Sequence, residues 1–201
     1  MKKSLVMAMV VLSAAGAFAE GKFSPLGVSI SQSAYASQDN QFPGRSDSVY
    51  GWRLALFSGA HRGMYGLATA VFVNADADAN GDAGGLQIAS LFNTAYGAEI
   101  GLWQLAAFHN SLSNSGNGFQ LCAFHNSSGG YFNGVQISIY NQSTQDMAGM
   151  QVGVVNRARS MYGVQIGVLN NAYSLVGAQL GLINIVQDSQ MVMFPIVRIG
   201  W

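Results

Sequence analysis

The chain has 201 residues, of which 9% are charged and 50% are hydrophobic, whereas a soluble domain typically has about 25% charged residues. Nine basic and nine acidic residues balance each other, so no basic face for nucleic acid is indicated. One cysteine, Cys122, excludes an internal disulfide framework. Beyond the N-terminal segment there is no apolar run of about 18 residues, which excludes a transmembrane helix.

The first 19 residues have the three parts of a secretory signal peptide. Lys2 and Lys3 form a short basic region, residues 5–12 are mostly apolar, and Ala17-Phe18-Ala19 is a small-residue cleavage site. We therefore predict that residues 1–19 are removed on export and that residues 20–201 form a single domain. No cysteine follows the cleavage site, so a bacterial lipid anchor is not expected.

The remainder is built from repeats of one eight-residue phrase, Gly-x-Gln-apolar-small-apolar-x-Asn. The copies begin 14 to 19 residues apart and are clearest over residues 134–184. They begin at Gly51, Gly66, Gly85, Gly118, Gly134, Gly149, Gly163 and Gly177. Between residues 97 and 109 two overlapping copies of opposite parity fit, GAEIGLWQ and LWQLAAFH, so we expect a bulge or turn there. A short fixed period predicts a repeat architecture.

Each phrase has the pattern of a β-strand. In residues 163–168, Val, Ile and Val alternate with Gly, Gln and Gly, which is the period of a sheet with two unlike faces. A helix is disfavoured because glycine recurs twice in each phrase, at about 1 kcal/mol each relative to alanine. The linkers between phrases are polar or small, as turns are. The sequence therefore predicts an all-β fold.

Two all-β architectures fit this alternation. In a β-solenoid the apolar row would point into a narrow core while Gln and Asn stack in ladders from coil to coil. In an antiparallel transmembrane β-barrel the apolar row would face lipid and the small and polar row would line the lumen. The uniform linkers favour the solenoid, because the turns of antiparallel hairpins alternate between two sides of a membrane. The recurrent glycines and a strand length of about nine residues favour the barrel.

The last eleven residues, MVMFPIVRIGW at 191–201, tip this balance. They resemble the C-terminal strand of bacterial outer-membrane barrels, which ends in Phe or Trp and acts as the assembly signal. Pro195 argues against regular pairing here and should lie at a bulge or at the strand's entry. We predict an antiparallel transmembrane β-barrel of about 10–12 short strands. The resemblance implies outer-membrane lipid as a partner, and the barrel-assembly machinery as another through the strand ending in Trp201.

The repeated phrase also resembles a family of bacterial surface repeat-containing proteins, in which G-x-Q-I-G-x-x-N units precede a strand containing Phe-Pro. The likeness covers residues 134–201 well and the N-terminal half weakly. It implies a location at the outer membrane or cell surface and brings no established activity.

Motifs that carry chemistry are few. No serine-hydrolase, zinc-protease or phosphate-loop motif occurs, and we expect a non-enzymatic protein. The segment DADANGDAGG resembles the first half of a calcium loop, with Asp76, Asp78, Asn80 and Asp82 as candidate metal ligands. The closing glutamate of such a loop is missing, because Gln87 stands at its position. Calcium is therefore a candidate cofactor with an incomplete ligand set.

Three charged residues are predicted to lie inside the barrel. Arg53 and Glu99 occupy the Gln position of their phrases, and Arg198 falls on the same face of the last strand. The sequence Phe-His-Asn-Ser occurs twice and places His109 and His125 at equivalent strand ends. Parallel coils would stack these two rings at about 4.8 Å, whereas antiparallel hairpins would separate them by about 25–30 Å.

These features leave two functions open. The first is an outer-membrane barrel with a structural, adhesive or narrow-pore role. The alternative is a secreted β-solenoid that acts as a binding module.

Overall fold

The computed structural model describes residues 23–29, 41–42, 48–61, 63–76 and 83–201, so the expected signal peptide lies outside the described residues. Every regular element in these ranges is a β-strand, which confirms the predicted all-β class. The same ranges hold no helix that is long and apolar enough to cross a membrane.

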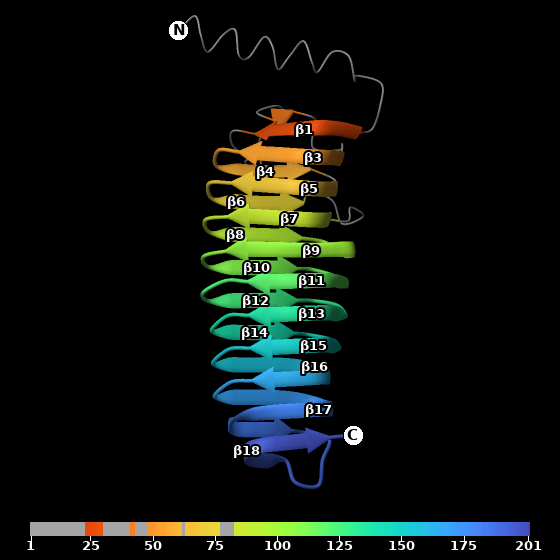
Figure 1. The fold of residues 1–201 in the computed structure, drawn as a ribbon, viewed down its shortest axis with the longest axis vertical. Helices are drawn as coiled ribbons and strands as arrows, with labels where there is room; N and C mark the ends of the chain where they lie inside the picture. The colour runs from red at the N-terminus through yellow and green to blue at the C-terminus, as the bar shows by residue number, and fades with distance from the viewer. Residues whose placement is uncertain (1–22, 30–40, 43–47, 62, 77–82) are drawn as a thin grey trace, which may run out of the picture.

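The strands stack into one column of about eight coils, and each complete coil contributes a longer and a shorter strand (Figure 1). The long row consists of β1 (Phe23–Ser29), β3 (Ser48–Ala55), β5 (Gly63–Ala70), β7 (Ala83–Ala89), β9 (Ala98–Ala106), β11 (Gly116–Leu121), β13 (Phe132–Ile137) and β15 (Met147–Val152). The short row consists of β4 (Ser58–His61), β6 (Val73–Asp76), β8 (Phe92–Ala95), β10 (His109–Leu112), β12 (His125–Ser128) and β14 (Tyr140–Ser143). Towards the C-terminus β16 (Val155–Ile166) and β17 (Leu169–Val186) each run through both rows, while β2 (Gln41–Phe42) and β18 (Met193–Gly200) lie near the two ends.

Successive strands of each row pair in parallel, so the predicted antiparallel barrel is wrong and the fold is a parallel β-solenoid. Among the described strands only β1–β2 and β17–β18 are antiparallel. Gly149, Gln151 and Val152 of β15 stand directly opposite Gly163, Gln165 and Ile166 of β16. The uniform linkers were the correct signal, because every coil turns in the same way. With the barrel, the predicted transmembrane strands and the narrow-pore role are also overturned.

In-register stacking builds two ladders of buried amides along the axis. The glutamines of the long row are at most 1% exposed and the asparagines of the short row are 0% exposed. Gln165 donates from Nε2 to Oε1 of Gln151 over 2.7 Å, and Asn156 donates from Nδ2 to Oδ1 of Asn170 over 2.8 Å. The glutamine ladder comprises Gln87, Gln104, Gln120, Gln136, Gln151, Gln165 and Gln179, and the asparagine ladder comprises Asn74, Asn93, Asn110, Asn126, Asn141, Asn156, Asn170 and Asn184.

The two glycines of the phrase have separate backbone reasons. Gly163 has a φ of +137°, which L side chains rarely adopt, and a Cβ there would lie 2.1 Å from the Gly149 carbonyl oxygen. A Cβ on Gly167 would lie 2.3 Å from the Gly153 carbonyl oxygen and 2.6 Å from Nδ2 of Asn156. The first glycine thus permits a backbone conformation, and the second leaves room for the asparagine ladder.

The side chains that flank each glutamine point outward. Gln165 is 0% exposed whereas its neighbour Ile166 is 38% exposed, as alternation along a strand requires. The apolar interior is therefore thin and lies beside the ladders, with Phe132, Met147 and Met161 among its largest members. The outward direction of the Val-Ile-Val row is the one predicted for a barrel, while the amide ladders are those predicted for a solenoid.

The predicted closing strand, 191–201, is observed as β18, which lies antiparallel on β17 at the C-terminal end of the column (Figure 1). Its register shifts between Gly181 and Asn184, opposite Ile196 and Phe194, so Pro195 lies at an irregularity as predicted. Because β18 runs against the direction of the coils, it ends the parallel pairing.

The ladders generate a stability prediction. Replacing Gln165 by alanine removes the donor to Gln151 and the acceptor of Gln179, and should cost about 3 kcal/mol because buried amide groups lose partners. Ile166→Ser, at an exposed site one residue away, should cost about 1 kcal/mol or less. Urea unfolding followed by circular dichroism would measure both variants. A silent Gln165→Ala beside a damaging Ile166→Ser would contradict the buried ladder.

Candidate binding surface

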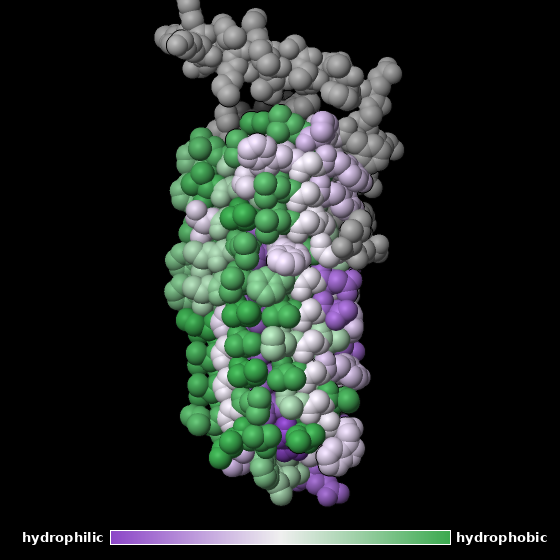
Figure 2. Space-filling view, viewed as in Figure 1, coloured by the Kyte–Doolittle hydropathy of each residue, from purple (hydrophilic) through white to green (hydrophobic). Residues whose placement is uncertain are grey.

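The outward side chains of the long row form a continuous apolar band along the column, which we call the apolar face. Figure 2 shows this band running the whole length of the described solenoid, with polar side chains gathered along another edge. Parallel register places equivalent outward residues of successive coils over one another. The residues before the glutamine position are Trp52, Leu67, Leu86, Trp103, Phe119, Val135, Met150, Val164 and Ala178, and those after it are Leu54, Thr69, Ile88, Leu105, Leu121, Ile137, Val152, Ile166 and Leu180.

Beside these residues the turn into the short row adds a ridge. In the C-terminal half this ridge consists of Ile139, Val154 and Val168, which are 45–49% exposed. The turns of several earlier coils carry one more residue, so that Phe57, Phe72, Phe108 and Phe124 lie there. Phe108 and Phe124 stack with ring centroids 5.0 Å apart and planes 7° from parallel. The apolar face is therefore aromatic towards the N-terminus and aliphatic towards the C-terminus.

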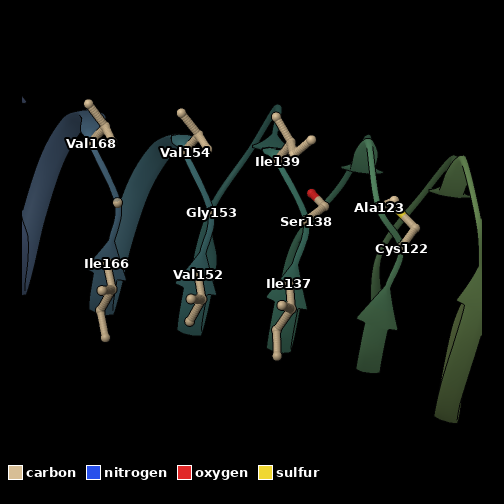
Figure 3. A pocket seen from close by; sticks show the side chains of 11 residues that line it. Cys122, Ala123, Ile137, Ser138, Ile139, Val152, Gly153, Val154, Ile166 and Val168 are labelled. Atoms are coloured by element: carbon tan, nitrogen blue, oxygen red, sulfur yellow. The ribbon is translucent and has the colours of Figure 1, made fainter.

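A shallow groove of about 500 Å³ runs along the aliphatic half, parallel to the solenoid axis (Figure 3). One wall consists of Ile137, Val152 and Ile166, and the other is the ridge of Ala123, Ile139, Val154 and Val168. The floor consists of small residues, Cys122, Ser138, Gly153 and Gly167. The groove repeats the same wall, floor and ridge in the three coils from Ile137 to Val168.

The requirements of the asparagine ladder account for the small residues of this floor. At Gly153, as at Gly167, a Cβ would meet the preceding coil's backbone and the ladder amides. Ser138 instead donates its hydroxyl to Oδ1 of Asn141 over 2.8 Å, and Cys122 donates its thiol to Oδ1 of Asn126 over 3.2 Å. Cys122 is buried, and burial is the main cause that raises the pKa of its thiol.

His109 and His125 stand in register on neighbouring short strands, with ring centroids 4.7 Å apart. This is the spacing that the sequence predicts for parallel coils. Tyr140 continues the row, 5.0 Å from His125. Burial lowers the pKa of both imidazoles, and for His125 the neighbouring His109 lowers it further. Their planes are 41° apart, so the rings are tilted against each other. Within the described ranges no cluster of three His, Cys, Asp or Glu side chains could hold a metal, so this pair has no third ligand beside it.

The three predicted interior charges have different positions. Arg53 is 0% exposed in the glutamine row, where its guanidinium donates to the Ala75 carbonyl over 3.0 Å and to Oδ1 of Asn74 over 3.4 Å. It therefore caps the N-terminal end of the asparagine ladder, a role that sequence reasoning missed.

Arg198 of β18 stands opposite Gln179 and donates to Oγ of Ser189 over 2.5 Å and to the Met191 carbonyl. Glu99 lies at the irregular start of β9, where the register shifts between Ala98 and Leu102. In that coil Gln104 takes the ladder position, so the predicted bulge is confirmed and the second of the overlapping copies is the one in register.

Most of the candidate calcium loop lies outside the described residues. Asp76 is the last residue of β6, and Asp78, Asn80 and Asp82 lie outside the described residues. The calcium site stays a prediction.

Comparison with protein-family models, curated proteins and solved structures found no match to this chain. The chain is a repeat protein that forms a parallel β-solenoid with stacked Asn and Gln ladders.

The imidazole pair predicts a pH dependence. Because both folded pKa values lie below the ordinary value of 6.5, the unfolded chain takes up protons first as the pH falls. The free energy of unfolding that the two neutral imidazoles contribute is therefore fully present above pH 6.5. It is lost as the pH falls from 6.5 towards the lowered pKa values of the folded protein. Thermal unfolding at several pH values between about 7.5 and about 5 should show this decline. The variant His109→Phe/His125→Phe replaces both imidazoles by aromatic rings that do not titrate. Its stability should fall less steeply with falling pH, and an unchanged pH profile would show that the two histidines do not cause the decline.

The groove floor predicts a packing defect. Gly167→Ala places a methyl group against the Gly153 carbonyl and Asn156, and should cost about 1–3 kcal/mol through overpacking. Val168→Ala, at the exposed neighbouring position, is the matched control and should cost less. Differential scanning calorimetry would rank the two variants, and equal effects would mean that the floor tolerates a Cβ.

Proposed function

We propose that this chain is an exported, non-enzymatic β-solenoid that acts as a binding module at the bacterial outer membrane or cell surface. Two features of the sequence support the location. Residues 1–19 have the pattern of a secretory signal peptide, and the repeated phrase resembles bacterial surface repeat-containing proteins. The apolar face is the contact surface of this module.

The observation that carries this proposal is the length and continuity of the apolar face. Monomeric soluble proteins rarely expose contiguous apolar patches above a few hundred Å², and larger patches mark interaction sites. Here apolar side chains are exposed from Trp52 in an early coil to Leu180 in a late one, and Figure 2 shows them as one band. An isolated exposed leucine would carry no such meaning.

The chemistry of the surface favours binding over group transfer. The most regular polar side chains, Gln and Asn, bond one another in the interior, and the groove is lined almost wholly by aliphatic or small residues. The residues that line it offer no base beside a nucleophile, as a catalytic site would require. Apolar contact along the axis is what such a surface provides.

Two partners predicted from the sequence stay predictions. Outer-membrane lipid would meet the same apolar face. Recognition by the barrel-assembly machinery would use β18 and Trp201, which is 98% exposed.

Adsorption to octyl-coated beads tests the proposal. The exported protein should adsorb strongly, and Ile139→Lys/Val154→Lys/Val168→Lys should adsorb at least about tenfold more weakly, because three exposed apolar positions become charged. Circular dichroism checks that the variant keeps its fold.

The matched control places lysines on the outward side of the short row, where Gln142 and Asn171 occupy equivalent positions. Gln142→Lys/Asn171→Lys should adsorb like the unaltered protein. Equal losses in the two variants would mean that net charge, and not the apolar face, governs adsorption, and the proposal would fail.

A further inference from the structure

A groove and a ridge lie side by side on the aliphatic half of the apolar face. The groove has the floor Ser138, Gly153 and Gly167, and the ridge consists of Ile139, Val154 and Val168 (Figure 3). Both repeat once per coil, at the spacing of about 4.8 Å between paired strands. A partner that fills this groove along its length must carry apolar side chains at the same interval.

The ridge of this chain itself has that interval. We propose that the apolar face binds a second copy of the chain, so that the ridge of each copy enters the groove of the other. This inference rests on the proposed function, in which the apolar face is the binding surface, and it names the partner. The product is a two-fold symmetric dimer with an isologous interface.

Symmetry selects the orientation of the two copies. A two-fold axis perpendicular to the solenoid axis, lying in the interface, would leave the ridge on the same side of the face in both copies. The ridge of one copy would then meet the ridge of the other. An axis parallel to the column exchanges the two lateral positions, so the ridge of one copy meets the groove of the other. The solenoids therefore run parallel, and each coil faces the same coil of its partner.

Charge permits this arrangement on the apolar face. In a parallel two-fold contact each residue lies at the same height as its own copy, and a residue close to the axis lies near that copy, so a charged residue there would meet a like charge. Among the side chains that the structure describes, the outward positions beside the glutamine row and the ridge carry no charged residue from Trp52 to Leu182. The outward side of the short row carries Arg157, with Arg159 nearby in the same strand, and would repel its own copy.

The area is sufficient for a specific dimer. About eight coils at about 4.8 Å give a length of about 38 Å, and five residues of strand at about 3.3 Å give a width of about 16 Å. The face then covers about 600 Å² per copy and about 1,200 Å² per pair, which enters the range of specific interfaces. Because the ridge of one copy enters the groove of the other, the buried area exceeds that of a flat rectangle.

Sedimentation equilibrium of the exported full-length protein tests the association. The unaltered protein should be dimeric, and Val154→Lys should raise the dimer dissociation constant at least about tenfold by placing two like charges at the contact. Gln142→Lys on the short row is the matched control and should leave the constant unchanged. A dimer that Val154→Lys leaves intact would overturn the proposal.

Disulfide trapping tests the orientation. In a Cys122→Ser background, which copies Ser138 at the equivalent position, Ile139→Cys and Val168→Cys should each form a disulfide-linked homodimer under mild oxidation. A mixture of the two variants should give no mixed dimer, because their coils lie two steps apart, about 9.6 Å, beyond the ~7 Å limit between bridgeable Cα atoms. Mixed dimers without self-linked ones would show antiparallel copies and would overturn the parallel arrangement.

The two proposals fail in different ways. A protein that stays monomeric at every concentration but still adsorbs to octyl beads through Ile139, Val154 and Val168 refutes the dimer and leaves the binding face standing. A monomer whose adsorption does not depend on these residues refutes both.

Discussion

The amide ladders impose the constraint on which the rest of this structure depends. A buried amide is stable only when its donors and acceptors have partners, and here each rung finds them in the coils before and after it. For this to hold, every coil must return a glutamine and an asparagine to the same place above the last. That requirement fixes the parallel register, the glycines beside the ladders and the short turns.

The two ladders run in opposite directions, so their dipoles oppose each other along the column. Asparagine amides donate towards the C-terminus, as Asn156 does to Asn170, and glutamine amides donate towards the N-terminus, as Gln165 does to Gln151. The asparagine ladder therefore leaves an acceptor oxygen at its N-terminal end, and the glutamine ladder leaves one at its C-terminal end. Arg53 donates to the asparagine ladder at one end, and at the other Oε1 of Gln179 has no donor among the described residues, with Arg198 in the opposite register position. A cationic residue thus stands at each acceptor end.

The sequence predicted the strands, their repeat and the outward direction of the Val-Ile-Val row, because alternation and periodicity are local properties. The prediction of antiparallel pairing was wrong, because parallel and antiparallel sheets have the same alternation of side chains along each strand. The two arrangements differ only in which strands pair with each other. The glycines were misleading, since Gly163 and Gly167 suggested a crowded lumen when they serve a positive φ and the space of a neighbouring amide. The groove could not be predicted, because it combines a ridge of turn residues with a wall of strand residues from several coils. The cap formed by Arg53 was equally hidden, since its partner Asn74 lies in the next coil.

The antiparallel pairing of β18 on β17 has a consequence for how such a chain changes length. Since β18 closes one end and Arg53 stands near the other, the coils between them are interchangeable units with no special role at either end. Duplicating the 14-residue unit from Gly149 to Tyr162 would add one rung to each ladder and leave both ends as they are. The column would lengthen by about 4.8 Å for each such event. Unequal recombination within the repeats can therefore adjust the reach of the apolar face in steps of one coil, without a new core having to evolve.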